Sequence, residues 1–338
     1  MHKALLSLTL CLGCLTAGAQ DRGFSIHGNV NLPDGYSVGL VCHTDTAFSV
    51  EMANGTIKDG RFLLTGKVDH PLSGTLMTNN LDLIEKNQWP MDSVRWTYTD
   101  VFVSNNDIYV DQALNVTGGM VQKDFNEYQA MKGEGRDWTF ITSYPSSVVS
   151  VYLANNMLQR GYNLTKEQVE LLEKSITDVP DDPKRMEEFR QRIAYAKKTT
   201  KGGTLVDLEL KDTKGKVRNL LKVMPQNKFV LVDFWASWCG ICIASMPEIK
   251  EIAEQYKDKL DVIGVSIDTK EDAWRKAMAK HPEPWPQYIT TAKGYKDLFD
   301  KYQVGNGVPY YIMVAPDGTV LSSPSTPEAV REIMEKYQ

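Results

Sequence analysis

The sequence predicts an α/β domain at the carboxyl end of the chain, a mostly antiparallel β domain at the amino end, and a helical linker between them. Three observations support this organisation. Apolar and polar residues alternate in short runs from about Phe24 to Val116, a helical period follows from about Asp124 to Lys198, and strands alternate with helices beyond Gly203. At 338 residues the chain is long enough for two domains.

The first 19 residues have the pattern of a secretory signal peptide. Lys3 supplies the positive charge, residues 4–15 the apolar run, and residues 17–19 (Ala-Gly-Ala) a cleavage site of small residues. We therefore expect residues 1–19 to be removed and the protein to reach the periplasm or cell envelope. Lipid anchoring at Cys14 is the alternative, although the three residues before it fit a lipoprotein signal poorly. A buried helix of the mature fold is a third interpretation.

Composition narrows the function classes. The chain is 42% hydrophobic and 24% charged, and beyond residue 20 it has no apolar stretch of about 18 residues, so we expect no membrane span after cleavage. The formal net charge of -5 provides no basic surface for nucleic acid or anionic lipid. We expect no nucleic-acid partner.

Residues 20–123 are predicted to form a β-sandwich-like domain. The alternating runs are FSIHGNV, YSVGLVC, KDGRFLLTGKV, SGTLMT and NDIYV, separated by turn residues. Cys42 ends one of these runs and is predicted to be a buried, inert thiol. The aromatic residues of TNNLDLIEKNQWP and RWTYTDVF could line a binding surface, but ordinary sheet packing and turns are the favoured interpretation.

Residues 124–200 are predicted to be a helical linker region. Thr165 and Gln168 have the spacing of a capping box, and Asp182-Pro183 is a suitable cap and first-turn pair for a helix over PKRMEEFRQRIAYAKK. The polar stretch 197–203 marks the boundary to the last domain.

Residues 201–338 are predicted to form the α/β domain. A hairpin over LVDLEL and KVRNLL comes first, and a second hairpin over PYYIMVA and GTVLSS comes near the end. Between them lie the strands FVLVDFW and DVIGVSI and the helices CIASMPEIKEIAEQYK and KEDAWRKAMAK, and the helix TPEAVREIMEKY follows. This alternation predicts parallel strand pairs joined by crossover helices.

Two cysteines, Cys239 and Cys242, are separated by only Gly240 and Ile241. A structural zinc site would need four ligands, and no second pair of cysteines or histidines has the spacing for one. A structural disulfide across two residues would restrict the unfolded chain very little. Signal cleavage leaves three cysteines, so at least one thiol stays outside any intramolecular disulfide.

Position favours a reactive pair instead. Cys239 follows the buried strand FVLVDFW and precedes a helix, so it should lie among the unpaired N–H groups at the helix amino terminus. Such an environment lowers a cysteine pKa from ~8.5 to roughly 3.5–7.5 and makes it a nucleophile. Cys242, nearly one turn further, is placed to resolve a mixed disulfide formed at Cys239.

At these residues the chain resembles the thioredoxin fold and, within it, the TlpA/ResA-like exported thiol-disulfide oxidoreductases. The resemblance rests on VDFWASWCGIC, on Pro247, on Val308-Pro309 and on the segments SIDTKEDAWRKAMAK and PEPWPQY, and it covers about Leu205 to Gln338. The β-rich region resembles a domain of unknown function found fused ahead of such proteins in Gram-negative envelopes.

The resemblance implies further roles. Asp233 matches an acidic residue that handles protons for the resolving cysteine, and a lone carboxylate in FVLVDFW should have a raised pKa if buried, although it could instead lie at an exposed strand end. Pro309 matches a cis-proline that presents the backbone of Val308 to an extended substrate. Trp238 matches a residue packed beside Cys239; in isolation an aromatic residue there would more often be plain core.

Two departures from the family pattern concern electron flow and proton handling. Ile241 stands where proline is usual, and the Gly240-Ile241 pair is expected to tune the reduction potential. Gly264 stands where thioredoxin carries a lysine near the position of Asp233.

The sequence therefore predicts an exported protein-disulfide reductase that uses the Cys239–Cys242 pair and no bound cofactor or metal. Expected partners are disulfide-containing envelope proteins and a membrane thiol-transfer donor that returns electrons. The alternatives are a disulfide oxidase or isomerase with the same site, and an envelope binding module to which the redox domain is accessory. A peroxidase is less favoured, because the sequence lacks a peroxiredoxin-type Pro-x-x-x-Thr/Ser-x-x-Cys stretch.

Overall fold

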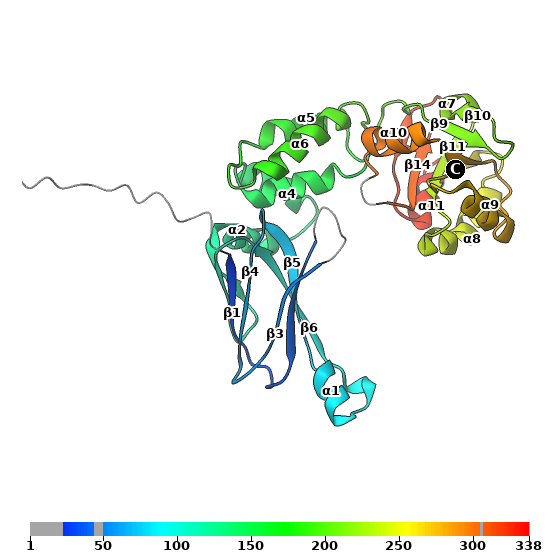
Figure 1. Cartoon of the computed structure of the whole chain (residues 1–338). Helices are drawn as coiled ribbons and strands as arrows, with labels where there is room; N and C mark the ends of the chain where they lie inside the picture. Colours follow the sequence, from blue (N-terminus) through cyan, green and yellow to red (C-terminus); the bar gives the residue numbers. More distant parts are fainter. Residues whose placement is uncertain (1–22, 44–49, 305–306, 338) are drawn as a thin grey trace, which may run out of the picture. The chain divides into compact units, whose positions relative to one another are not determined.

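The computed structural model describes residues 23–43, 50–304 and 307–337 (Figure 1). The signal sequence predicted over residues 1–19, with Cys14, lies outside these ranges. The chain forms two compact units, one up to Arg136 and one from Asp137 onward. The predicted boundaries at residues 123 and 200 remain predictions.

The first unit contains two four-stranded sheets that share one apolar core, as expected for a β-sandwich. Buried and more exposed residues alternate along the strands, as in RFLLTG and LSGTLMTN. Each strand therefore turns one face toward the shared core, which is why the two sheets pack against each other. All strand pairs are antiparallel except β1 with β7, which are parallel. In sheet order the strands are β4 (Arg61–Gly66), β1 (Phe24–Asn29), β7 (Asp107–Val110) and β8 (Val116–Thr117), then β3 (Val50–Thr56), β2 (Ser37–Cys42), β5 (Leu72–Asn79) and β6 (Trp96–Val103).

Cys42 lies fully buried at the end of β2 and is unpaired. The predicted burial is therefore confirmed, and it raises the pKa of the thiol to about 11.

For the segment between β5 and β6 the favoured prediction was sheet packing and turns, but the structure has helices there. It contains the helix α1 (Leu81–Asn87) and the short 3-10 helix η1 (Met91–Ser93), and the segment RWTYTDVF forms most of β6. Trp96 and Tyr98 in β6 are 41% and 61% exposed, and their rings stack with centroids 6.2 Å apart. These aromatic side chains therefore lie on the surface of the domain and not in its core.

The predicted helical region contains five helices. The capping box of Thr165 and Gln168 is present at the start of α5, and Asp182 caps α6 with Pro183 in its first turn, so both predicted helix starts are confirmed. The helices are α2 (Gly119–Ala130), which contacts β6 in the first unit, and α3 (Arg136–Ser143), α4 (Val148–Met157), α5 (Lys166–Ser175) and α6 (Pro183–Ala196).

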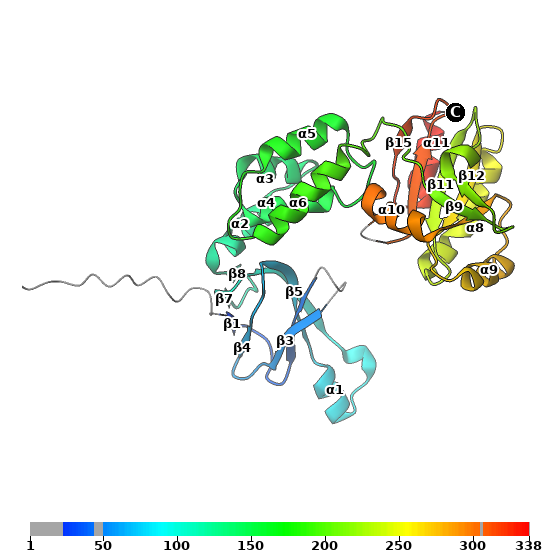
Figure 2. The ribbon, with the colours of Figure 1, turned by 45° about the horizontal axis from the view of Figure 1, so that its top comes forward.

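The rest of the second unit is a seven-stranded mixed sheet with helices on both faces, the predicted thioredoxin-like α/β fold (Figures 1 and 2). The central strand β11 pairs in parallel with β12 and antiparallel with β14, and β12 pairs in parallel with β13. In sheet order the strands are β10 (Val217–Asn219), β9 (Glu209–Asp212), β13 (Gln287–Thr290), β12 (Leu260–Ser266), β11 (Phe229–Trp235), β14 (Tyr310–Val314) and β15 (Val320–Ser322).

Helices α8 and α11 share one apolar cluster with one face of this sheet, and α9 and α10 contribute to the cluster on the other face. Both predicted hairpins are present, but the run KVRNLL ends as a strand at Asn219 and continues as a helix. Here the helices are α7 (Leu220–Val223), α8 (Gly240–Gln255), α9 (Glu271–Lys280), α10 (Ala292–Tyr302) and α11 (Pro327–Glu335). The helix α10 and the strand β13 had no counterpart in the sequence prediction.

Candidate active site

Cys239 and Cys242 form a disulfide at the amino terminus of α8. The strand β11 ends at Trp235, the turn 236–238 follows, and Cys239 is the cap residue of the helix. Its sulfur accepts a hydrogen bond from the backbone N–H of Cys242 over 3.2 Å. The predicted position of Cys239 at a helix amino terminus is therefore confirmed, and this position favours a thiolate when the disulfide is reduced.

A buried carboxylate anchors the turn that leads to Cys239. Asp268, which is 4% exposed, accepts hydrogen bonds from the backbone N–H of Ser237 over 2.9 Å and from the hydroxyl of Ser237 over 2.6 Å. The hydroxyl of Ser266 donates a third hydrogen bond to it over 2.7 Å. Sequence reasoning missed Asp268, because its only sequence signal is the Ser-Ile-Asp run at the end of a strand.

The Val308–Pro309 segment lies beside the disulfide. The sulfur of Cys239 is 3.4 Å from the carbonyl oxygen of Val308, and the Val308–Pro309 peptide bond is cis, as the resemblance implied. Two segments about 70 residues apart in the sequence therefore meet at one sulfur atom.

The two cysteines are largely covered, with Cys239 5% exposed and Cys242 3% exposed. By contrast, the neighbouring side chains of Trp238 and Ile241 are 66% and 65% exposed. The interpretation of Trp238 as plain core is therefore wrong. A molecule that reaches Cys239 therefore meets the exposed apolar side chains of Trp238 and Ile241 close to it in the sequence.

Gly240, the first residue of α8, is surface exposed, and apart from its chain neighbours and the backbone of its own helix no atom lies within 4 Å of where a side chain would begin. Neither residue of the pair between the cysteines is thus fixed by packing. Their identity can change without disturbing the fold around the disulfide.

Asp233 lies in the middle of β11 and is 4% exposed, so the alternative of an exposed strand end is wrong. Burial, with a smaller effect of the negative charge of Glu283, raises the pKa of its carboxyl group to about 7. Among the described residues no hydrogen bond joins Asp233 to either cysteine. Glu283, whose own pKa is raised by burial, was missed because nothing in PEPWPQY indicates that it lies near β11.

Gly264 is paired with Asp233 across the β11–β12 ladder. The side chain of Gln287 from β13 occupies the space where a side chain at position 264 would lie, and its Oε1 accepts a hydrogen bond from Trp235 Nε1 over 3.0 Å. The space beside Gly264, where the resemblance places a lysine in thioredoxin, is therefore filled by the side chain of Gln287 from the next strand.

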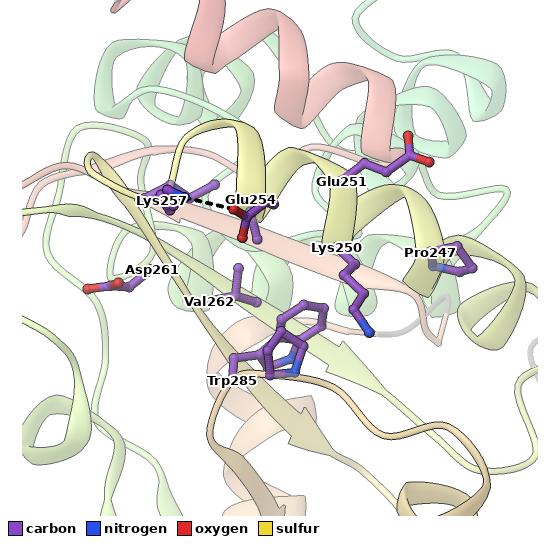
Figure 3. A pocket seen from close by; sticks show the side chains of 11 residues that line it. Pro247, Lys250, Glu251, Glu254, Lys257, Asp261, Val262 and Trp285 are labelled. Atoms are coloured by element: carbon purple, nitrogen blue, oxygen red, sulfur yellow. Dashed lines mark hydrogen bonds and ion pairs between the residues drawn. The ribbon is translucent and has the colours of Figure 1, made fainter.

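A groove lies on the same domain (Figure 3). It is formed by α8, β12 and the loop before β13, with Trp285 and Lys250 on its wall and an ion pair of 2.9 Å between Lys257 and Glu254. Neither cysteine lines it, and we assign it no reaction. In residues 23–43, 50–304 and 307–337, no group of three His, Cys, Asp or Glu side chains is arranged to hold a metal ion. No helix in those ranges is both long and apolar enough to cross a bilayer.

A disulfide at the start of a helix, directly after the central strand of a mixed sheet and beside a cis-proline, is the arrangement expected of the thioredoxin fold. Comparison with known proteins agrees, because a family model described as thioredoxin-like matches residues 227–320. The chain therefore contains a thioredoxin-like domain.

Two curated relatives are thioredoxins. The thioredoxin of Acidithiobacillus ferridurans is 41% identical over 66 residues, which cover 20% of this chain and 51% of that protein. Thioredoxin-T of Drosophila melanogaster is 38% identical over 50 residues, covering 15% of this chain and 32% of that protein. The chain thus spans about a half and a third of the length of these relatives.

Solved structures with similarity to this chain include a thiol:disulfide interchange protein from Bacteroides sp. at 27% identity and a TM-score of 0.37, covering 41% of this chain and 90% of that one. Another is a putative thiol:disulfide interchange protein DsbE from Chlorobium tepidum, at 26% identity and a TM-score of 0.35, covering 40% of this chain and 96% of that one.

Proposed function

We propose that the protein is an exported thiol-disulfide oxidoreductase that reduces disulfides of envelope proteins. The observation that carries this proposal is the sulfur of Cys239, which caps α8, accepts the N–H of Cys242 and lies 3.4 Å from Val308 O. The curated relatives named thioredoxin support the class of reaction. The signal-like amino terminus supports export.

The reaction begins with the reduced pair. The thiolate of Cys239 attacks one sulfur of a substrate disulfide, so that a Cys239–substrate bond forms and the second substrate sulfur leaves as a thiolate that takes up a proton. The sulfur of Cys242, after losing its proton, attacks Cys239. The Cys239–Cys242 disulfide forms as the Cys239–substrate bond breaks, and the substrate sulfur leaves as a thiolate that takes up a proton. The substrate is thus released as a dithiol and has gained two electrons.

The other predicted residues have roles in the same cycle. Asp233, with its pKa near neutrality, accepts the proton of Cys242. The backbone of Val308, fixed by Pro309, and the exposed side chain of Trp238 receive the substrate chain. No bound cofactor takes part, because the dithiol itself holds the two electrons. A membrane thiol-transfer partner returns them in an oxidising compartment.

A trapping experiment tests the nucleophile. With Cys242→Ala, mixed disulfides should accumulate at Cys239 in the intact cell envelope, and mass spectrometry should identify the attached proteins. Cys239→Ala is the matched control and should trap nothing. A folded Cys242→Ala variant without any attached protein would contradict the assignment of the nucleophile.

The reduction potential tests the direction of electron flow. A value near the ~-270 mV of thioredoxin supports a reductase, whereas a value of about -120 to -180 mV supports the alternative of an oxidase or isomerase. Ile241 is exposed in the first turn of α8, where proline is tolerated, so Ile241→Pro should fold normally. The potential of that variant measures how far Ile241 tunes the pair.

A second candidate function concerns the amino-terminal domain. Its exposed Trp96 and Tyr98 form a stacked pair on β6, an edge strand of its sheet, which favours the hypothesis of a partner-binding module. Replacing both residues with Ala should leave reduction of a soluble protein disulfide unchanged and reduce the set of proteins trapped in cells. Deletion of residues 20–125 with unchanged activity in cells would leave this domain without a required role.

A further inference from the structure

Arg160, in the turn between α4 and α5 of the helical region, lies at the Val308–Pro309 segment. Its Nη2 donates a hydrogen bond to the carbonyl oxygen of Pro309 over 3.4 Å, and its guanidinium carbon is 5.5 Å from the centre of the Tyr310 ring. Pro309 follows directly after Val308, the residue whose carbonyl contacts the sulfur of Cys239. A residue from outside the thioredoxin-like sheet thus binds the residue next to the one that contacts the disulfide.

The backbone next to Arg160 is tied to both ends of the segment that leads to Pro309. The N–H of Gly161 donates to the carbonyl of Tyr302, the last residue of α10, over 2.8 Å. The hydroxyl of Tyr310, the first residue of β14, donates to the carbonyl of Gly161 over 2.7 Å. These two bonds fix the helical region at the residues immediately before and after residues 303–309.

Glycine is required at position 161 for this approach. A Cβ atom there would lie 2.7 Å from the carbonyl oxygen of Tyr302, closer than non-bonded atoms come. The contact is reinforced by Gln303, whose side-chain amide donates to the carbonyl of Arg192 in α6 over 3.1 Å. The sequence of the helical region is therefore adapted to this contact.

The charge of Arg160 has no structural explanation of its own. The side chain is half-buried and, within the described part of the chain, it forms no ion pair, while its Nη1 is fully covered and without a hydrogen-bond partner. Buried charges are normally paired, because removing them from water is unfavourable. The bond to Pro309 and the ring of Tyr310 are its two interactions, and both lead to the Val308–Pro309 segment.

We propose that Arg160 is a positioning residue for the thiol-disulfide site, which holds the Val308–Pro309 segment so that its backbone is correctly placed for a substrate polypeptide at Cys239. The proposal rests on the proposed function. It distinguishes two kinds of substrate. A protein disulfide needs both Cys239 and the placed backbone, whereas a small disulfide needs only the sulfur of Cys239.

The test compares both substrates in one set of variants of the full chain. Arg160→Met keeps most of the volume and removes the donor; Arg160→Lys keeps a charge and one donor. Arg190→Met is the control, because Arg190 belongs to the same helical region and is 57% exposed. With dithiothreitol as electron donor, kcat/KM is measured for insulin. Dithiothreitol reduces 5,5'-dithiobis(2-nitrobenzoic acid) directly. For this small disulfide the second-order rate constant is therefore measured with the pre-reduced protein after dithiothreitol has been removed.

Arg160→Met should lower kcat/KM for insulin about five- to tenfold, the effect of losing one hydrogen bond to a charged donor, and should change the small-disulfide rate less than about twofold. Arg160→Lys should lower the insulin value about two- to threefold, because an ammonium group cannot both reach Pro309 and stack on Tyr310. Arg190→Met should match the wild type.

Equal losses for both substrates, or an insulin value in both variants that matches the wild type, would overturn the proposal. If Arg160→Met does not fold, as judged by its thermal unfolding, Arg160→Lys decides by the same comparison. A wild-type protein inactive toward both substrates would instead contradict the proposed function, so the two failures are distinguishable.

Discussion

The backbone N–H of Cys242 donates a hydrogen bond to the sulfur of Cys239 over 3.2 Å. The donor belongs to the backbone, so it does not depend on the side chain of Cys242. The same sulfur therefore has a donor in the oxidised protein and, once the disulfide is reduced, a partner that favours its negative charge.

The first prediction concerns the pKa of Cys239 in the Cys242→Ala variant. The backbone donor is retained and the competing thiol is gone, so the pKa of Cys239 should fall from the usual ~8.5 to about 7.5 or below. Thiolate absorbance at 240 nm, followed against pH, measures it. The double variant with Cys239→Ala gives the background. A pKa of 8.5 or more would show that the helix terminus has no effect.

The second prediction concerns Asp233 and the pH dependence of stability. Its pKa is about 7 in the folded protein and about 3.9 in an unfolded chain. The folded state holds this proton more tightly, so the stability it adds is fully present below pH ~4 and is lost as the pH rises through about 7. Between pH 4 and pH 8 the wild type should lose on the order of 3 kcal/mol relative to Asp233→Asn, which has no proton to lose there.

Urea unfolding of both proteins across this pH range measures the difference. Asp258→Asn is the matched control, because Asp258 is exposed on the same domain and should leave the pH dependence of the wild type unchanged. If the free energy of unfolding changes with pH in the same way for the wild type and Asp233→Asn, the pKa of Asp233 is not raised by folding, and the prediction is wrong.

The third prediction concerns the anchor of the turn before Cys239. In Asp268→Ala, both acceptor oxygens are lost, and the backbone N–H of Ser237 and the hydroxyl groups of Ser237 and Ser266 lose their acceptor. The free energy of unfolding should fall by about 1–3 kcal/mol, the usual effect of leaving a buried polar group unsatisfied. Chemical denaturation measures it, with Asp258→Asn again as control. Unchanged stability would mean that water replaces the lost acceptor.

The fourth prediction concerns the reactivity of Cys42. Because burial raises its pKa to about 11 and covers the sulfur, iodoacetamide at pH 8 should leave it unmodified in the folded protein. After unfolding in urea, peptide mass spectrometry should find it alkylated. Rapid alkylation of Cys42 under native conditions would show that the β-sandwich opens frequently at β2.

The sequence was most informative where local signals coincide with tertiary structure. Phe229–Trp235 is both the predicted and the observed strand, because a continuous apolar run bounded by polar residues has few alternatives. The caps of α5 and α6 were predicted for a similar reason, since the first depends on Thr165 and Gln168, three residues apart, and the second on the adjacent pair Asp182-Pro183.

Helix α10 was missed because one of its residues serves a distant contact. Gly294 lies in its first turn, where a Cβ would collide with the carbonyl oxygen of Glu209 in β9. Glycine weakens a local helix signal by about 1 kcal/mol relative to alanine. The residue that tertiary packing requires is therefore one that obscures the helix in the sequence.

The site divides in the same way. The cysteine pair and the position of Cys239 at the helix start follow from residues close in sequence. Arg160 and Glu283 reach the site only through the fold, from the helical region and from the loop before β13. No spacing rule connects either of them with residue 239.

The pairing of Gly264 with Gln287 restricts how this domain can change over evolution. Any side chain at position 264 would displace the glutamine and break its hydrogen bond to Trp235, the residue that ends the central strand. A change to lysine at this position thus requires the end of the Gln287 side chain to move and to give up this hydrogen bond. The residue types at positions 264 and 287 should therefore covary among homologues, because a larger side chain at 264 removes the reason for a glutamine at 287.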